Sequence, residues 1–153
     1  MTRTDELIAA FCGRDPAAFE LCCTPDVHYE DPMTAEPLES VQALGAHAQR
    51  LWKSFPDARA EPTGAALTDG QHIAAPCKLV ATHRGDTEGL PASGRFIVVQ
   101  CVAYCQLDEA GERLWRVRVF FDLYDAAVQL GVLPKAGTIG DRALRVLRGL
   151  GVS

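Results

Sequence analysis

The hydrophobic positions of this chain follow two different periods. Up to residue 55 they recur every three to four residues, and the longest such stretch, residues 39–55, predicts an amphipathic helix. Its buried face is expected to contain Val41, Leu44, Ala48, Leu51, Trp52 and Phe55. Shorter helices are predicted over residues 5–12 and 16–22, and the alternating residues 26–31 predict a short strand that stops at Pro32.

After residue 57 the period changes to two. Strands are predicted over residues 58–67, 73–84, 96–107 and 114–123, separated by stretches rich in turn-forming residues. The last strand runs directly into a short helix that begins at Leu123. Helices followed by consecutive strands predict an α+β fold, in which a curved antiparallel sheet wraps around the long helix and leaves an apolar, cone-like cavity.

The last strand has two very different faces. One face is wholly apolar (Trp115, Val117, Val119, Phe121 and Leu123), and the other is mixed (Leu114, Arg116, Arg118, Phe120 and Asp122). The apolar face is predicted to be core or, together with Ile97, Val99 and Cys101, a homodimer surface. The mixed face suits either solvent or a pocket, and the order of the neighbouring elements favours the pocket.

Length and charge narrow the class of protein. A chain of 153 residues predicts a single domain, with its core over about residues 4–134 and a C-terminal helix over 138–150. The net charge of −5 argues against a nucleic-acid partner, because phosphate binding requires a basic surface. We find no signal peptide and no apolar run long enough for a membrane span, so we expect a cytoplasmic protein without membrane contact.

The motifs of several common chemistries are missing from the sequence. It contains no Gly-rich phosphate loop, no nucleophile elbow and no cluster of residues with metal-ligand spacing. The six cysteines also lack zinc spacing and are expected to be reduced, buried thiols. A catalytic thiol at Cys77 or Cys101 is the alternative.

Asp122 is the acidic residue with the most apolar sequence neighbours. If it faces the cavity beside Arg118, it can act as an anionic base that removes a proton next to a carbonyl group. Alternatively, Asp122 caps the helix that begins at Leu123. The residues alone leave both interpretations open.

Four segments, in order along the chain, resemble one known family. They are VHYEDP (27–32), WKSFPDARA (52–60), ATHRGDTEGLPASGR (81–95) and FFDLYDAAVQLGVLP (120–134). Together they resemble the SnoaL-like polyketide cyclase family, within the ketosteroid-isomerase-like superfamily. The fold that this resemblance implies is a cone of helices closed by a curved antiparallel sheet.

The resemblance also implies a chemistry and a set of site residues. The aspartate at position 122 would act as general acid/base on the carbon next to an ester or ketone, and the carbanion would close a ring by aldol attack. No metal or organic cofactor is implied. Arg118 and His83 would assist catalysis, although His83 has the alternative role of fixing its hairpin. The residues expected to contact a hydrophobic small-molecule substrate are Tyr29, Asp31, Gln100, Tyr104 and Phe120.

Three functions follow from these observations. The first is a cofactor-independent cyclase or isomerase that acts on a hydrophobic, carbonyl-bearing metabolite. The second is epoxide opening, which would need a second carboxylate, such as Asp31, facing the base across the cavity. The third is a non-enzymatic binding or dimerisation module in which Asp122 points away from the cavity.

Overall fold

The structure is a computed structural model that describes residues 1–133 except 88, together with residues 137, 142–143, 145–146 and 149. The elements in chain order are α1 (Arg3–Gly13), the 3-10 helix η1 (Pro16–Ala18), α2 (Phe19–Cys22), β1 (Cys23–Glu30), α3 (Val41–Ser54), β2 (Arg59–Pro62), β3 (Leu67–Thr68), β4 (His72–Thr82), β5 (Phe96–Leu107), β6 (Leu114–Phe121) and α4 (Leu123–Leu130). The predicted C-terminal helix over 138–150 falls mostly outside the described residues and stays a prediction.

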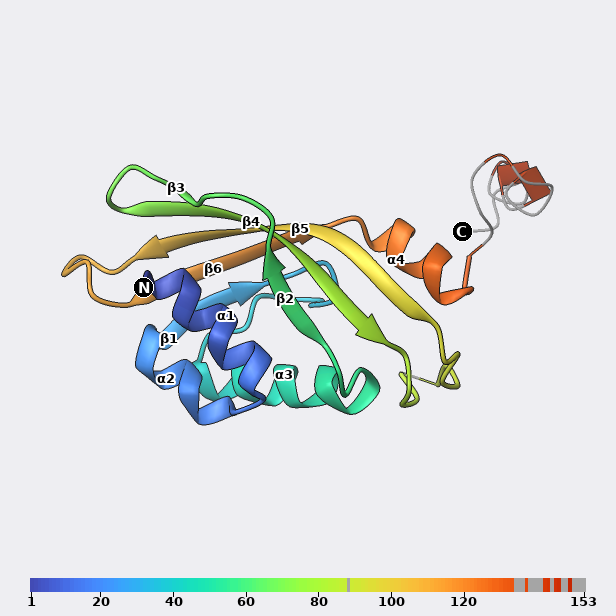
Figure 1. Cartoon of the computed structure of the whole chain (residues 1–153), viewed down its shortest axis with the longest axis horizontal. Coiled ribbons are helices and arrows are strands. Elements are labelled where there is room, and N and C mark those ends of the chain that lie inside the picture. The colour runs from blue at the N-terminus through green and yellow to red at the C-terminus, as the bar shows by residue number, and fades with distance from the viewer. Residues whose placement is uncertain (88, 134–136, 138–141, 144, 147–148, 150–153) are drawn as a thin grey trace.

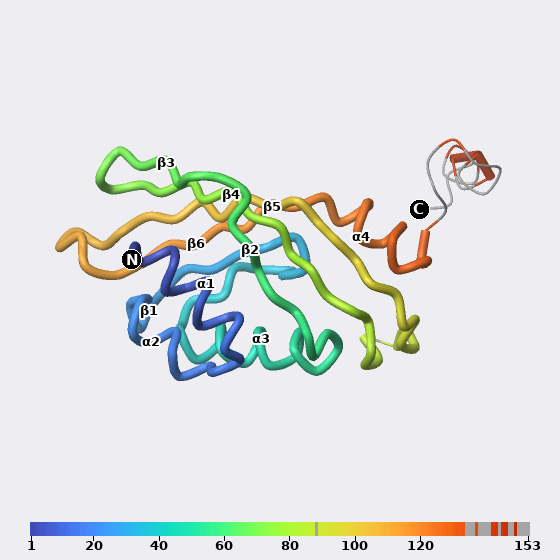
Figure 2. Tube along the Cα trace, in the orientation of Figure 1, coloured from blue at the N-terminus to red at the C-terminus, as the bar shows by residue number. Residues whose placement is uncertain are grey.

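The strands form one curved sheet with the order β1-β6-β5-β4-β2, and β3 pairs with β4. Figure 1 shows α1, α2 and α3 together on one side of this sheet, and the strand curvature is clearest in Figure 2. The predicted α+β fold, with a curved sheet around a long helix, is confirmed. One detail differs, because β1 pairs with β6 in parallel and the sheet is therefore mixed. Residues 31–113 supply the long crossover that a parallel pair requires.

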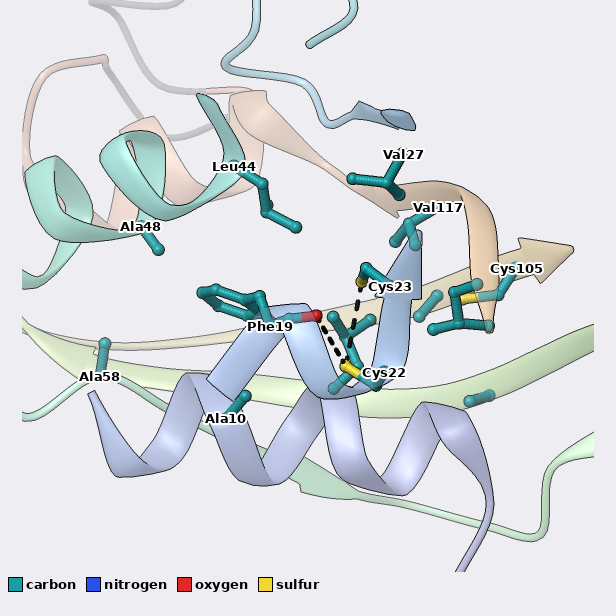
Figure 3. Close-up of a cluster of buried hydrophobic side chains, with 14 of the residues drawn as sticks. Ala10, Phe19, Cys22, Cys23, Val27, Leu44, Ala48, Ala58, Cys105 and Val117 are labelled. Atoms are coloured by element: carbon teal, nitrogen blue, oxygen red, sulfur yellow. Dashed lines mark hydrogen bonds between the residues drawn. The ribbon is translucent and has the colours of Figure 1, made fainter. Parts of the chain in front are cut away.

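The core lies between the helices and the concave face of the sheet. Along β5 every second side chain is buried on this face: Ile97, Val99, Cys101, Ala103 and Cys105. The cluster in Figure 3 brings Phe19 of α2 and Leu44 and Ala48 of α3 together with residues of the strands. Its centre includes Val27 and Val117, which are completely buried. The sheet is therefore apolar on its concave side because that side excludes water.

The segment that follows α3 is tied to the end of β4 by a carboxylate. Asp57 accepts two hydrogen bonds of 2.7 Å, one from the backbone N–H of Thr82 and one from its hydroxyl group. These bonds hold the pKa of Asp57 below its usual value. Next to them, the N–H of Gly85 donates to the carbonyl oxygen of Ser54. The hairpin after β4 is thus anchored to the end of α3.

Gly85 is expected to be intolerant of any side chain. A Cβ atom at this position would lie 2.2 Å from the carbonyl oxygen of Lys53, which belongs to the backbone and cannot rotate away. We expect Gly85→Ala to lower the free energy of unfolding in urea by about 1–3 kcal/mol, because overpacking forces the backbone to shift.

Gly13→Ala is the matched control for this substitution. Its Cβ would meet nothing within 4 Å at the end of α1, so it should leave stability unchanged or raise it by up to about 1 kcal/mol. Equal stabilities of the two variants would contradict the proposed close contact.

Helix α4 covers the end of the sheet where β6 stops. The last pair between β5 and β6 joins Cys101 to Phe121, so the backbone of Val98 has no strand beside it on that side. The side-chain amide of Gln129 replaces the strand, accepting from the N–H of Val98 and donating to its carbonyl oxygen, both at 2.8 Å. Among the described residues, no helix has the length and apolar character that crossing a bilayer requires.

Candidate active site

A cavity of about 510 Å³ lies between the concave face of the sheet and the helices α1, α3 and α4. Its volume is within the range of roughly 300–1,000 Å³ that is typical of small-molecule sites. The wall is mainly hydrophobic and includes Leu7, Phe11, Leu44, Leu51, Phe55, Ile97, Val99, Val119, Phe121 and Leu130. Such a cavity favours a largely apolar ligand.

Three polar side chains meet in this apolar wall. The Tyr29 hydroxyl donates to Oδ2 of Asp31 at 2.8 Å, and Nε2 of His47 lies 2.8 Å from the same oxygen. The other carboxylate oxygen, Oδ1, accepts from the backbone N–H groups of Met33 (2.7 Å) and Thr34 (3.1 Å). Only 5% of the Asp31 side chain and 13% of the His47 side chain are exposed. The carboxylate therefore has four donors around it and little contact with solvent.

The local structure explains how these three residues meet. Val27 is completely buried on β1, and the alternation of the strand turns Tyr29 and Asp31 to the same side. His47 lies on α3 between Leu44 and Leu51, one turn from each, and therefore points with the apolar face of the helix toward the sheet.

The hydrogen bonds determine the protonation states. Burial acts to raise the pKa of Asp31, but the hydrogen bonds from His47 and Tyr29 outweigh it and hold this pKa below its usual value. Burial, and then the negative charge of Asp31, raise the pKa of Tyr29 well above that of a free phenol. At neutral pH the group thus contains an aspartate anion and a neutral tyrosine.

The ionised carboxylate also fixes the tautomer of His47. Since Asp31 can only accept, Nε2 of His47 must carry the hydrogen, and Nδ1 of the neutral ring is then a free base. Nδ1 has no hydrogen-bond partner among the residues that the structure describes. Asp31 already accepts four hydrogen bonds, so it is better placed to orient His47 than to remove a proton from a substrate itself.

The sequence-predicted site residues fall into separate places. Tyr29 and Asp31 line the cavity, whereas Arg118, Gln100, Tyr104 and Phe120 lie on the opposite, convex face of the sheet. The expected orientation of β6 is therefore wrong. Its apolar face forms the core and the cavity wall, which also corrects the proposed homodimer surface of Val117, Val119, Phe121, Ile97, Val99 and Cys101.

The physical reason for this orientation is the cost of burying charge. On the convex face Arg118 forms an ion pair with Glu30 of β1 at 2.6 Å and stacks over the ring of Phe120 at 5.2 Å. On the same face Tyr104 stacks on His72, with ring centroids 6.0 Å apart. The catalytic role of Arg118 and the substrate-binding roles of Gln100, Tyr104 and Phe120 stay predictions.

Asp122 occupies the N-cap of α4. Its Oδ1 accepts from the N–H of Asp125 at 3.1 Å, and the side chain is exposed. The next residue, Leu123, lines the cavity, but Asp122 is not among the residues of its wall. In the structure Asp122 therefore caps α4, as one of the two interpretations expected, and its role as a base stays a prediction.

His83 fastens the hairpin between β4 and β5. It is 2% exposed, it stacks on Phe55, and its Nδ1 accepts from the N–H of Ser93 at 3.1 Å. Nε2 therefore carries the hydrogen in the neutral ring and donates to Oγ1 of Thr87 at 3.0 Å. Thr87 itself lines the cavity, so its own hydroxyl hydrogen remains available to a ligand.

The sequence interpretation missed His47. The predicted buried face of residues 39–55 contains apolar residues only, although His47 interrupts this stripe between Leu44 and Leu51. A polar ring within an otherwise hydrophobic helix face was the signal. Within the described part of the chain there is no group of three or more His, Cys, Asp or Glu residues arranged to hold a metal ion.

The sequence was compared with models of known protein families. The family model for SnoaL-like polyketide cyclases matches residues 2–130. A comparison with curated protein sequences found no match.

Several solved structures have the same fold. TsrD from Streptomyces laurentii is 21% identical with a TM-score of 0.74, covering 86% of this chain and 93% of that one. IdmH from Streptomyces antibioticus, a candidate polyketide cyclase, is 22% identical with a TM-score of 0.72, covering 85% and 96%. A Catenulispora acidiphila protein with a ketosteroid isomerase-like fold, in complex with trimethylamine, is 16% identical with a TM-score of 0.72, covering 86% and 95%. At these identities the likeness concerns the fold alone.

Proposed function

Because the chain belongs to the SnoaL-like polyketide cyclase family, we propose that it is a cofactor-independent cyclase or isomerase of hydrophobic, carbonyl-bearing metabolites. The observation that carries this proposal is the buried pair of Asp31 and His47 in an otherwise apolar cavity. Such a site can bind an apolar substrate and present one acid/base group to it.

In the proposed reaction His47 is the general acid/base. Its Nδ1 takes the proton from the carbon next to a carbonyl, and Asp31 stabilises the imidazolium that forms. The hydroxyl of Thr87, whose oxygen accepts from His83, is the candidate donor to the enolate oxygen. In a cyclase the carbanion then attacks a second carbonyl of the same molecule, and His47 returns its proton to the new alkoxide. His83 takes part as a positioning residue for Thr87.

Epoxide opening is less well supported. It would need an acid facing the base across the cavity, and Asp31 is the one carboxylate among the described residues of the cavity wall. Asp31 is also occupied by four donors. Proton removal next to a carbonyl requires only one proton-transfer group at the reacting carbon. The residues of this cavity wall therefore fit carbonyl chemistry better than epoxide opening.

Proton exchange tests the proposal without knowledge of the natural substrate. The protein is incubated in D₂O with a panel of multi-ring ketones and β-keto esters, and deuterium at the carbon next to the carbonyl is measured by mass spectrometry. Exchange above the buffer rate for at least one compound is expected. If compounds bind but none of them exchanges, the result would support the third function, the non-enzymatic binding module. That function expects Asp122 to point away from the cavity, and the helix-cap geometry of Asp122 is consistent with it.

The homodimer is proposed through the convex face of the sheet. This face exposes five large apolar side chains: Phe96 (55%), Phe120 (49%), Val102 (40%), Tyr104 (39%) and Val98 (37%). Val102 and Phe120 are opposite each other in the register of β5 and β6, so they form part of one surface. Several exposed apolar side chains on one face are a common mark of a protein interface.

Charged substitutions should separate such a dimer. We expect the double variant Phe96→Lys and Phe120→Lys to sediment as a monomer under conditions in which the unmodified chain sediments as a dimer, because burying two ammonium groups from each protomer opposes association. Leu21→Lys is the control, since Leu21 is 73% exposed on α2, which lies on the helical side of the sheet. If the double variant remains a dimer, the interface lies elsewhere.

A further inference from the structure

Two cysteines lie beside each other in the wall of the cavity. Cys77 of β4 and Cys101 of β5 are directly opposite in the register of the two strands, and their Sγ atoms are 2.6 Å apart. Both side chains are on the concave face and line the cavity. Their sulfur atoms are closer than non-bonded heavy atoms at optimal contact, which even for carbon are about 3.5–4.0 Å apart. The two sulfur atoms therefore need only a short further approach to reach the S–S bond length of about 2.0 Å.

The backbone already has the geometry that a disulfide requires. Opposed residues of an antiparallel pair have Cα atoms roughly 4.5–5.5 Å apart. Disulfides span Cα distances of about 4.4–6.8 Å, so neither strand must move to form the bond.

The other four cysteines lack this arrangement. Cys22 and Cys23 are adjacent in the chain (Figure 3), and their Sγ atoms are 3.9 Å apart. Cys105 is opposite Ile73, and the thiol of Cys12 faces the carbonyl oxygen of Ala60 at 3.5 Å. Of the six thiols, Cys77 and Cys101 alone combine direct opposition across strands with access to a cavity.

We propose that Cys77 and Cys101 form a reversible disulfide when a small oxidant such as hydrogen peroxide enters the cavity. One sulfur, as a thiolate, attacks a peroxide oxygen, the O–O bond breaks, and a sulfenic acid and one water form. The second sulfur displaces the sulfenic oxygen as a second water and completes the S–S bond. The two thiols lose two electrons and two protons, and the peroxide is reduced to two molecules of water.

The hydrogen bond with Cys101 lowers the pKa of the Cys77 thiol, against the opposing effect of burial, whereas the same contact and burial raise the pKa of Cys101. A dithiol reductant reverses the reaction by thiol–disulfide exchange. The crosslink does not depend on the proposed enzymatic function.

Peptide mapping of the full chain tests this directly. The reduced protein is treated with hydrogen peroxide, the remaining thiols are alkylated after unfolding, and the peptides are mapped without reduction. We expect a linked pair that contains Cys77 and Cys101 and lacks two hydrogen atoms, with the other four of the six cysteines alkylated. Dithiothreitol should return all six thiols. Alkylated Cys77 and Cys101 after the treatment, or links between other cysteines, would overturn the proposal.

Thermal unfolding supplies the second measurement. The bond closes a loop between residues 24 positions apart, so the oxidised protein should melt at a higher temperature than the reduced protein. Cys105→Ala, which keeps the pair, should show the same rise, and Cys101→Ala should show none. If Cys101→Ala does not fold, the comparison of oxidised and reduced unmodified chain still decides, since equal midpoints would contradict the crosslink.

Discussion

His47→Gln should reduce deuterium exchange next to a substrate carbonyl by about 100-fold or more, the loss expected when a general base is removed. The glutamine amide can still donate to Oδ2 of Asp31, so the hydrogen bond at 2.8 Å has a replacement. However, an amide cannot take up a proton at neutral pH. The unfolding midpoint should therefore change little, and the loss should appear in kcat more than in KM.

The chain offers a matched control for this variant. His72 is paired with Asp69 at 3.1 Å, but these two side chains are 36% and 67% exposed and neither residue lines the cavity. His72→Gln should leave exchange unchanged. An unchanged rate in His47→Gln would reject His47 as the base.

Asp122→Asn separates the two candidate bases. If Asp122 only caps α4, the asparagine still accepts the hydrogen bond from Asp125, and both activity and stability should be nearly unchanged. A loss of exchange in Asp122→Asn with a normal unfolding midpoint would instead favour the catalytic role that the family resemblance implies.

Asp31→Asn should have the second large effect, a fall in exchange of roughly 10²–10⁴-fold that does not exceed the loss in His47→Gln, because Asp31 acts through the base. The asparagine oxygen can keep the two backbone N–H donors, but its amide group then faces Nε2 of His47 as a second donor. This conflict is relieved when Nε2 loses its hydrogen and Nδ1 gains it. The ring would then present an N–H group to the substrate instead of a base. We also expect a loss of about 1–3 kcal/mol in the free energy of unfolding.

The acid dependence of stability gives an independent measurement. The folded-state pKa of Asp31 is lowered, so the stability that its ionisation contributes is complete above the unfolded pKa of about 3.9. This contribution is lost as the pH falls through the lower, folded-state value. Unfolding measured across this range should therefore lose less stability in Asp31→Asn than in the unmodified chain.

Asp26→Asn is the control on β1, the strand that leads to Asp31, because Asp26 is exposed. It should change neither the exchange rate nor the acid dependence. A wild-type exchange rate in Asp31→Asn would remove Asp31 from the mechanism.

The local elements were predictable because local spacing determines them. The amphipathic pattern of residues 39–55 corresponds to α3 (Val41–Ser54), and the alternating pattern of residues 96–107 corresponds to β5. The turn and cap residues set the boundaries, as the change from Phe121 at the end of β6 to the N-cap at Asp122 illustrates. The sequence also contained the signals for an α+β fold with an internal cavity.

The orientation of each strand face could not be read from β6 alone. Alternation distinguishes two faces but does not say which one meets the helices, and the mixed face of Arg118 and Asp122 suited a pocket as well as solvent. In the folded chain Arg118 finds Glu30 on the convex face, while Val119 and Phe121 line the cavity. The free-energy cost of desolvating the arginines is avoided when the mixed face of β6 lies on the convex side of the sheet, and this determines the orientation of the strand.

The sequence by itself determined the main helices and strands of the described residues, the family and the apolar character of the cavity, because each depends on residue type and short-range spacing. Tertiary structure alone decided which polar groups meet inside it. Asp31 and His47 are 16 residues apart, in a loop and a helix, and become partners only when β1 and α3 pack together. For the same reason Asp122, the acid that the sequence made prominent, lies at a helix N-terminus while a different carboxylate lies in the cavity.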